Sequence, residues 1–445
     1  MKKILLIAML GIAYTTTAQT LSYNDIGVLF SNENINGTAR FNAMSGAFGA
    51  LGGDISAMDI NPAGAAVFLK SEFAISLNNR NTQVNANYYG NNELSENDYT
   101  NLSQAGGVFV FKNYNGNSGW GNVAIGFNYS ITNDFENQWF ANGNSNFAPI
   151  TDLYDNNPVV YINSDGQHFE NYTSGKTDKY SFTLASKFDD NLYLGAAINT
   201  YNVNYYQNVL IEEYNNDGNG NTFDVSQTQK LSTYGDAFSF NIGLISKPND
   251  NVRFGLAYQS PVWYNLSEDF VEYDVNIFEN GSNTSSDFSG VNAFDYKLRT
   301  PSKLTGSFAY IFDKQGLISV DYIYKNYSNI TLTNANFSAE NQAFKTDLES
   351  VGELRIGTEW RFDKFSIRGG YHTAKSPYKN AFSSENVDGF SLGAGFKFRG
   401  GNFDVSYQKS SYTAPYNFYP QYNEVEATNL NIDNSKLTAT LVLNI

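Results

Sequence analysis

The sequence of 445 residues contains no cysteine and only two histidines. Without cysteine the chain cannot form disulfides or thiolate metal sites, and it cannot carry a lipid on an N-terminal cysteine. Neither His168 nor His372 is accompanied by a serine and an acid in a pattern typical of a hydrolase, which needs a nucleophile, a base and an orienting group. We therefore expect no enzymatic activity, no cofactor and no bound metal.

Long hydrophobic runs are also missing. After residue 18 no run of 18 apolar residues occurs, and the mean hydropathy is −0.39, which excludes helical membrane spans. Charged residues make up 16% of the chain, whereas about 25% is usual in soluble domains. The net charge of −16 argues against nucleic acid or an anionic membrane surface as a partner.

The first 18 residues differ from the rest. Lys2 and Lys3 precede an apolar segment at residues 4–13, and Thr17 and Ala18 are small residues directly before Gln19. This is the pattern of a secretory signal peptide with its cleavage site. We predict that residues 1–18 are removed on export, which leaves either a soluble or cell-surface β protein or a transmembrane β-barrel.

Apolar and polar residues alternate with a period of two over many segments. In residues 123–127, for example, Val123, Ile125 and Phe127 are separated by Ala124 and Gly126. Such alternation gives a strand one lipid-facing and one lumen-facing side. A β-sandwich also alternates, but its strands are rarely so long and so rich in glycine. The sequence therefore predicts an all-β fold, a transmembrane antiparallel β-barrel.

We predict about 14 strands, an even number, over residues 71–445. They cover residues 71–86, 104–112, 119–131, 177–188, 191–207, 223–246, 251–269, 292–312, 316–332, 346–362, 364–374, 388–398, 402–412 and 435–445. Short turns alternate with long polar loops, and loops are predicted at residues 87–103, 132–176, 208–222, 270–291, 333–345, 375–387 and 413–434. This pattern is typical of a barrel in the bacterial outer membrane, with periplasmic turns and extracellular loops.

Residues 19–70 show no such alternation and are rich in small residues. Asn61 suits a helix N-cap and Pro62 the first helical position, which predicts a short helical turn over residues 62–68. Gly46, Gly49 and Gly52 have the spacing of a loose phosphate-binding loop, but no strand precedes them and no βαβ unit follows. The segment is too polar to cross a bilayer and too small to fold as a domain. We predict a compact plug, or hatch, inside the barrel.

Three weaker patterns leave alternatives open. Residues 215–220 resemble the start of a calcium loop, but Ser226 stands where a glutamate is expected, so the segment is either a solvated turn or a weak calcium site. Inward-facing charges either form a network across the lumen or hold a carboxylate head group: Lys187, Arg253, Lys303, Asp321, Arg361, Arg368 and Lys397. Aromatic residues near strand ends predict interfacial girdles: Trp120, Trp139, Phe140, Trp263, Tyr264, Tyr327, Trp360 and Tyr378.

At the hatch the sequence resembles the FadL-type family of outer-membrane transporters for long-chain fatty acids and other hydrophobic compounds. The similarity is more diffuse over residues 301–327 and 354–377. The residues that carry it are Gly37-Thr38-Ala39-Arg40, Gly46-Ala47, Asp54, Ser56-Ala57 and, most specifically, Asn61-Pro62-Ala63.

The resemblance implies passive uptake of a hydrophobic molecule, foremost a long-chain fatty acid. In such a mechanism the ligand enters a pocket in the barrel, the hatch rearranges, and the ligand leaves sideways beside a kinked strand into outer-membrane lipid. The implied hatch and gating residues are Asn61, Pro62, Ala63 and Gly64. Candidate ligand contacts, which could equally be packing residues, are Phe41, Met44, Phe48 and Phe68. Candidate kink positions, which could equally relieve crowding in a tilted barrel, are Gly119, Gly121 and Gly126.

Two further functions stay open at this point. The ligand could instead be an aromatic hydrocarbon or haem, and the barrel could be a non-transporting, adhesin-like protein that binds a partner with its loops. The hatch motif argues against the adhesin-like function, because a surface-binding barrel needs no plug. We expect a monomer whose partners are a hydrophobic small molecule and the surrounding lipid.

Overall fold

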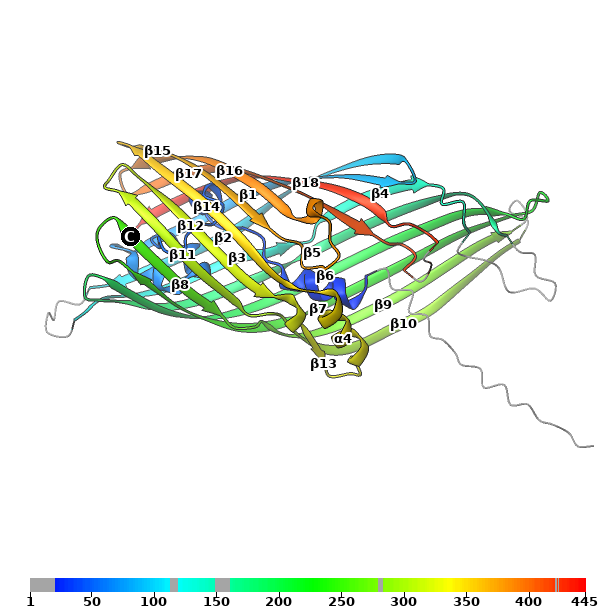
Figure 1. The fold of residues 1–445 in the computed structure, drawn as a ribbon, viewed down its shortest axis with the longest axis horizontal. Helices are drawn as coiled ribbons and strands as arrows, with labels where there is room; N and C mark the ends of the chain where they lie inside the picture. Colours follow the sequence, from blue (N-terminus) through cyan, green and yellow to red (C-terminus); the bar gives the residue numbers. More distant parts are fainter. Residues whose placement is uncertain (1–20, 113–118, 149–160, 279–282, 421, 423) are drawn as a thin grey trace, which may run out of the picture.

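The computed structural model describes residues 21–112, 119–148, 161–278, 283–420, 422 and 424–445. Within these ranges eighteen β-strands form one sheet (Figure 1). They are β1 (Glu72–Tyr88), β2 (Asn91–Phe111), β3 (Trp120–Asp134), β4 (Asn137–Gly143), β5 (Asn163–Phe188), β6 (Leu192–Asn216), β7 (Thr222–Ser246), β8 (Val252–Gln259), β9 (Trp263–Phe278), β10 (Asn283–Arg299), β11 (Lys303–Phe312), β12 (Gly316–Asn326), β13 (Thr331–Thr333), β14 (Ser350–Phe362), β15 (Phe365–Ala374), β16 (Val387–Phe398), β17 (Gly401–Tyr416) and β18 (Thr428–Asn444).

The sheet closes into a barrel. β1 pairs with β18 along one edge and with β2 along the other, both antiparallel. In four places two consecutive strands continue one line of the wall, β3 with β4, β8 with β9, β10 with β11 and β12 with β13, so the ring contains 14 barrel strands. A closed ring satisfies the main chain without a free edge, as a lipid environment requires. The predicted fold class is confirmed.

Several strands are much longer than a membrane requires. β5, β6 and β7 contain 26, 25 and 25 residues, whereas a tilted strand crosses the bilayer with about 9–11. Figure 1 shows β9 and β10 reaching far from the end of the barrel at which the chain terminates. The extra length lies on the side of the long connections, so the sheet continues beyond the membrane.

This extension corrects the predicted loops at residues 87–103, 132–176, 208–222 and 270–291. Most of the described residues in these ranges belong to β2, β4, β5, β6, β9 or β10. Outside the lipid neither face of a strand has to be uniformly apolar, so the alternation used to recognise strands is missing there. The main-chain pairing nevertheless continues, for example from Phe188↔Leu192 to Asn163↔Asn216 between β5 and β6.

Side chains separate into an outer apolar band and an inner face of small and polar residues. On β3, Ile125 and Phe127 are exposed, whereas Ala124, on the inner face, is buried.

Trp120 and Trp263 are exposed, as a girdle requires. Trp139, Tyr264 and Tyr327 are instead buried in interior hydrophobic clusters, so the girdle prediction is wrong for these three. Among the described residues, no helix combines the length and apolarity needed to cross a membrane.

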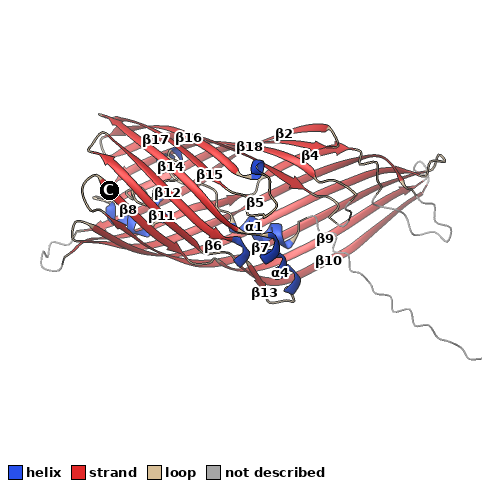
Figure 2. Cartoon of the chain, in the orientation of Figure 1, coloured by secondary structure: helices blue, strands red, loops and turns tan. Residues whose placement is uncertain are grey.

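The chain before β1 lies inside the barrel, as the helices in Figure 2 show. It forms α1 (Tyr23–Ser31), α2 (Ala39–Ala43), α3 (Ala57–Ile60) and the 3₁₀ helix η1 (Pro62–Val67). Glycines on the inner wall let its backbone approach closely. A Cβ atom added at Gly195 would lie 2.4 Å from the Pro62 carbonyl carbon, and one added at Gly243 would lie 2.1 Å from Asn61 Oδ1.

The long connections add η3 (Tyr327–Asn329), α4 (Ser338–Asp347) and η4 (Ser383–Glu385). α4 packs against α1, because Gly27 leaves a notch for the Phe344 ring: a Cβ atom there would lie 2.7 Å from Phe344 Cε1. Asn24 also donates to Asp347, at 3.0 Å. The outer connections therefore hold the first helix of the hatch.

Candidate functional site: the cavity, the wall gap and the hatch

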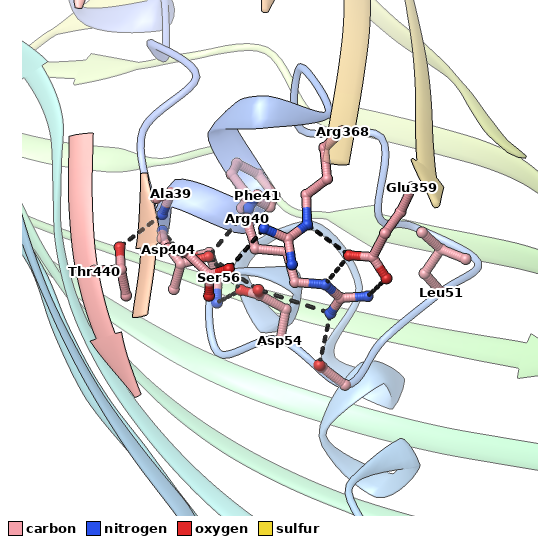
Figure 3. A network of polar contacts seen from close by, with 12 residues as sticks. Ala39, Arg40, Phe41, Leu51, Asp54, Ser56, Glu359, Arg368, Asp404 and Thr440 are labelled. Atoms are coloured by element: carbon pink, nitrogen blue, oxygen red, sulfur yellow. Dashed lines mark hydrogen bonds and ion pairs between the residues drawn. The ribbon is translucent and has the colours of Figure 1, made fainter. Parts of the chain in front are cut away.

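A buried ion-pair cluster fixes α2 to the wall (Figure 3). Arg40 donates from Nε to Glu359 on β14, at 2.7 Å. Glu359 also accepts from Arg368 Nε on β15, at 2.7 Å, and Arg368 in turn donates to Asp404 on β17, at 2.6 Å. Thr38 donates to Asp54, whose pKa is raised by burial although Arg40 and Thr38 oppose the shift. Removing one partner would leave buried charge unpaired, so the cluster specifies the position of α2.

Three of the other charges that the sequence predicts in the lumen contact the hatch. Lys303 pairs with Glu33, at 2.5 Å, and Asp321 accepts from the Gly49 amide, at 2.9 Å. Arg253 donates to the Leu51 carbonyl oxygen, at 2.7 Å. These three charges therefore belong to a network whose partner is the hatch, whereas Lys187 pairs with Asp190 at the β5–β6 turn and Lys397 is exposed.

The Asn-Pro-Ala-Gly segment is the second attachment. Asn61 is fully buried and donates from Nδ2 to the carbonyl oxygens of Gly49, at 2.7 Å, and of Leu244 on β7, at 2.9 Å. Its Oδ1 accepts from the Ala63 amide, at 3.1 Å, so Asn61 caps η1 and Pro62 begins it. The helical turn that the sequence predicts is present as a 3₁₀ helix, with Gly64 packed on Gly52. These contacts fix the segment in place; its gating role remains a prediction.

A cavity of about 1390 Å³ lies on the long-connection side of the hatch. It exceeds the roughly 300–1,000 Å³ of most small-molecule sites. Residues 21–36 of the hatch supply part of its lining. Apolar lining side chains include Val28, Leu29, Phe135, Tyr205, Ile323, Val351 and Ile432. Polar and charged ones include Glu33, Asn36, Arg80, Asp134, Lys325, Glu353, His372 and Lys436.

The wall beside this cavity contains a gap in its main-chain pairing. β2 and β3 pair from Phe111↔Val123 to Gln104↔Ser130, and the pairing stops there. Farther along, side chains connect the two sides: Asn101 donates to Asp134, at 2.5 Å, and Asn97 to the Gln138 carbonyl oxygen, at 2.7 Å. Ile131 and residues 133–136, where β3 passes into β4, line the cavity. We call this interruption the wall gap.

Residues 32–36 of the hatch cover the wall gap, and we call them the strap. The Asn34 amide donates to the Thr132 carbonyl oxygen, at 2.9 Å. Asn36 Nδ2 donates to the carbonyl oxygens of Ile131 on β3, at 2.8 Å, and of Ser103 on β2, at 3.3 Å. One asparagine therefore bridges the two strands at the point where their own pairing ends.

The apolar hatch residues singled out from the sequence lie elsewhere. Phe41, Met44, Phe48 and Phe68 are buried in two packed clusters and do not line the cavity. The Phe41 and Phe48 rings, for example, are 5.5 Å apart. The packing alternative describes their surroundings.

The candidate kink glycines lie before the wall gap. Gly126 pairs regularly with both neighbouring strands, and a Cβ atom there would lie 2.4 Å from Met58 Sδ, so it makes room for the hatch. Gly119 has a positive φ of 69°, and Gly121 falls within the register shift between Trp120 and Val123. The interruption of the β2–β3 ladder begins at residue 131 instead.

His168 contacts Asn142 and Glu170, and neither His372 nor the calcium-like segment lies in a catalytic or metal-binding arrangement. His372 Nδ1 lies 3.5 Å from Ser45 Oγ, but Ser45 is fully buried and bonded to Ser391, so a substrate carbonyl has no access to it. At the β6–β7 turn, hydrogen bonds from the Asn219 amide and from Asn221 hold the pKa of Asp217 below its ordinary value. The segment forms a hydrogen-bonded hairpin turn, and the described residues contain no cluster of three His, Asp or Glu placed to hold a metal.

The family model for outer membrane protein transport proteins (OMPP1/FadL/TodX) matches residues 25–414. The chain belongs to this family. A Pseudomonas aeruginosa FadL homologue superposes with a TM-score of 0.62 at 12% identity, over 93% of this chain and 99% of that one. The toluene transporters TbuX of Ralstonia pickettii and TodX of P. putida give TM-scores of 0.57 and 0.55 at 16% and 12% identity, with the same coverage. At these identities the likeness shows the fold alone, and no curated protein sequence matches the chain.

Membership of the OMPP1/FadL/TodX family places the chain among outer-membrane transport barrels. Sequence reasoning found the hatch but missed the strap and the wall gap. A signal was available, because Asn32, Asn34 and Asn36 alternate with Glu33 and Ile35 in the manner of an edge strand. The break in β2–β3 pairing carries no comparable signal, since residues 131–136 differ little in composition from their neighbours.

Proposed function

We propose that this protein takes up hydrophobic molecules across the outer membrane by passive diffusion. The observation that carries the proposal is the cavity, which has the hatch on one side and the wall gap on another. A cavity that meets an interruption in the wall offers a path from the barrel interior into the membrane. Family membership supports the same function.

The ligand class that fits the cavity best is an amphipathic chain, with long-chain fatty acids first. The lining combines a strip of apolar side chains with charged and amide groups, which suits a molecule with one polar end. The volume of about 1390 Å³ is several times that of a single aromatic ring. Aromatic hydrocarbons and haem are the alternatives that an experiment has to separate from fatty acids.

In the proposed path the ligand enters from the long-connection side, occupies the cavity and leaves through the wall gap once the strap has moved. The strap is the part of the hatch to displace, because it covers the wall gap, whereas α1 is held by α4 and α2 by the ion-pair cluster. Asn61 to Gly64 keep the remainder of the hatch in the barrel while this happens. The exit would deliver the ligand sideways into outer-membrane lipid.

Equilibrium binding tests the proposal. Dodecanoate, toluene and haem are titrated onto the folded barrel in a fluorinated detergent, and onto a variant with Asn61→Ala and Pro62→Ala. Saturable binding of dodecanoate, with an affinity changed in the variant, is the expected result. If none of the three binds saturably, transport is the wrong function, and the long extracellular sheet of β5, β6 and β7 would favour the surface-binding barrel.

A further inference from the structure

The outer face of β5, β6 and β7 changes character where these strands leave the lipid. Phe182 on β5 and Phe240 on β7 are exposed in the apolar outer band. Farther along the same face, cross-strand pairing aligns Asp178, Asn202 and Asp236 in one polar row, and Asn202 donates to Asp236, at 3.2 Å. Because charged side chains are costly within the hydrocarbon, this polar row marks the outer boundary of the lipid. The three strands continue well beyond it.

Beyond the polar row, three tyrosines form a diagonal line across the strands. They are Tyr172 on β5, Tyr206 on β6 and Tyr234 on β7, and we call them the tyrosine stripe. Tyr206 pairs across the strands with Ser174 and with Ser232. Tyr172 and Tyr234 lie two positions from these serines, so they are the diagonal neighbours of Tyr206, at about 7–8 Å. The Tyr172 and Tyr206 rings are 6.2 Å apart, edge to face. At about 3.3 Å per residue, the stripe lies roughly 7–20 Å beyond the polar row along the strands.

The stripe faces away from the barrel interior. Asn171, Tyr205 and Thr233, which directly precede the three tyrosines, are at most 3% exposed on the inner face. Because successive side chains of a strand point to opposite faces, the tyrosines point outward. Tyr234 is 48% exposed, and the other two are half-buried. Strand preference alone would be met equally well by threonine or valine, so it does not require large amphipathic rings on this face.

The side chains around the stripe are neutral hydrogen-bonding groups. Cross-strand partners share a face, so the partners of the three tyrosines lie beside the rings. Each of these partners carries an amide or a hydroxyl: Gln138, Ser174, Asn204, Asn208, Ser232 and Ser267. A tyrosine ring presents an apolar surface with a polar tip. Such a ring stacks on the C–H face of a sugar, while amides and hydroxyls bond to the sugar hydroxyls. The stripe therefore has the chemistry of a saccharide site.

The position of the stripe selects the source of the saccharide. The outer face of β5, β6 and β7 is continuous with the lipid-facing wall on the other side of the polar row. In an outer membrane the molecules beside this wall are lipids of the outer leaflet, and the sugars of a glycolipid head group extend outward from the lipid boundary. Lys176 and Lys230 are exposed on the same face, where an ammonium group pairs with phosphate or carboxylate groups of such a head group.

We propose that the tyrosine stripe binds the oligosaccharide of an outer-leaflet glycolipid. The rings of Tyr206 and Tyr234 stack on sugar units, and the amide and hydroxyl groups beside them bond to the sugar hydroxyls. The glycolipid then packs against the outer side of the extended sheet. This site lies on the outside of the wall, so it goes beyond the proposed uptake function and does not depend on it.

Calorimetric titration of the folded barrel in phosphatidylcholine nanodiscs tests the proposal. The probe is the core oligosaccharide that mild acid releases from the lipopolysaccharide of the bacterium that makes the protein. Saturable binding to the wild type is expected. Tyr206→Ser with Tyr234→Ser should weaken it roughly 10-fold or more, whereas Tyr206→Phe with Tyr234→Phe, which keeps both rings, should stay within about 3-fold.

A matched control is Tyr214→Ser. Tyr214 lies on the same face of β6, farther along the strand than Tyr206 and outside the stripe, and it is 43% exposed. Its replacement should leave the affinity for the oligosaccharide unchanged. Dodecanoate binding should also be unchanged in every variant, because none of the replaced tyrosines lines the cavity.

The outcomes separate the possible occupants of this face. If the wild type does not bind the core oligosaccharide saturably, or if the serine variant binds it as tightly as the wild type, the proposal is overturned. Binding of maltohexaose in place of the core oligosaccharide would overturn the glycolipid as the source. A wild-type dimer in detergent that the serine substitutions dissociate, measured by light scattering, would give the face to a second copy of the chain and also overturn the proposal. If the oligosaccharide binds and dodecanoate does not, the uptake function fails and the saccharide site stands.

Discussion

Replacing Glu359 by glutamine should detach α2 from the wall. The Glu359 side chain is 1% exposed, and it accepts hydrogen bonds from Arg40 Nε and Arg368 Nε, both at 2.7 Å. Losing the charge of one partner in such a buried cluster costs about 3–5 kcal/mol. Its third partner, Arg361, has a side chain that is 53% exposed and contributes little. Because 1.4 kcal/mol is a factor of ten, local opening of α2 should become roughly 10²–10⁴ times more frequent.

Hydrogen exchange of the folded barrel, read by mass spectrometry, measures this opening directly. Peptides covering Ala39–Ala43 should exchange faster in Glu359→Gln, while peptides from β6 should not change. Arg361→Gln is the matched control, since it removes the exposed partner and leaves the buried pairs intact. The barrel itself should stay folded. The unheated protein should therefore still migrate faster in gel electrophoresis than the heated, unfolded protein. Equal exchange of Ala39–Ala43 in the two variants would refute the idea that this cluster anchors the hatch.

Three further predictions concern other attachments of the hatch. Asn61→Ala should destabilise η1 by about 2–4 kcal/mol, because it removes a helix cap and two hydrogen bonds to buried carbonyl oxygens; Asn61→Asp, which keeps the cap, should cost less, and equal exchange rates would contradict the assignment. Phe344→Ala should cost about 3–5 kcal/mol of packing and expose α1 to proteolysis, whereas unchanged cleavage would show that α4 does not hold α1. Lowering the pH should loosen residues 21–36, and Glu33→Gln should abolish most of that change in hydrogen exchange.

The sign of the pH effect follows from the surroundings of Glu33. Burial by itself would raise the pKa of Glu33, but Lys303 and Lys325 hold it well below the ordinary 4.5. A carboxyl group with a lowered pKa stabilises the folded state at neutral pH, and this contribution is lost as the pH falls below the ordinary value. Residues 21–36 should therefore be less protected at pH 3 than at pH 7, when each exchange rate is divided by the intrinsic rate of an unprotected amide at the same pH.

The barrel could be predicted from the sequence because lipid imposes a rule on every strand that crosses it. Outward residues such as Ile125 and Phe127 must be apolar, so strand positions and strand number could be read from the alternation. The rule applies only to the part of each strand that contacts lipid. The outer parts of β5 and β6 therefore resembled polar loops, although their main chains pair as far as Asn163↔Asn216, with one register shift between Ser164 and Gly166.

The candidate site could be predicted only in part. Asn61 and Pro62 gave the correct local geometry, because an N-cap and a proline at the first helical position act within a few residues. The cavity and the wall gap depend on contacts between residues far apart in the sequence, from Asn36 with Ser103, 67 positions apart, to Lys436 with Ile35, 401 positions apart. No local pattern encodes such a contact. Phe41 and Phe48 looked like ligand contacts because packing residues and binding residues share the same apolar character.

Locking the strap tests the central claim most directly, namely that a ligand leaves the cavity through the wall gap. Asn34→Cys with Thr132→Cys places two thiols on adjacent segments whose backbones are joined by a hydrogen bond of 2.9 Å. Dodecanoate transfer is then measured across liposomes that contain the oxidised or the reduced barrel. The account predicts unchanged binding in both forms, with transfer blocked on oxidation and restored by reductant. Transfer at the same rate in the oxidised and reduced forms would contradict it.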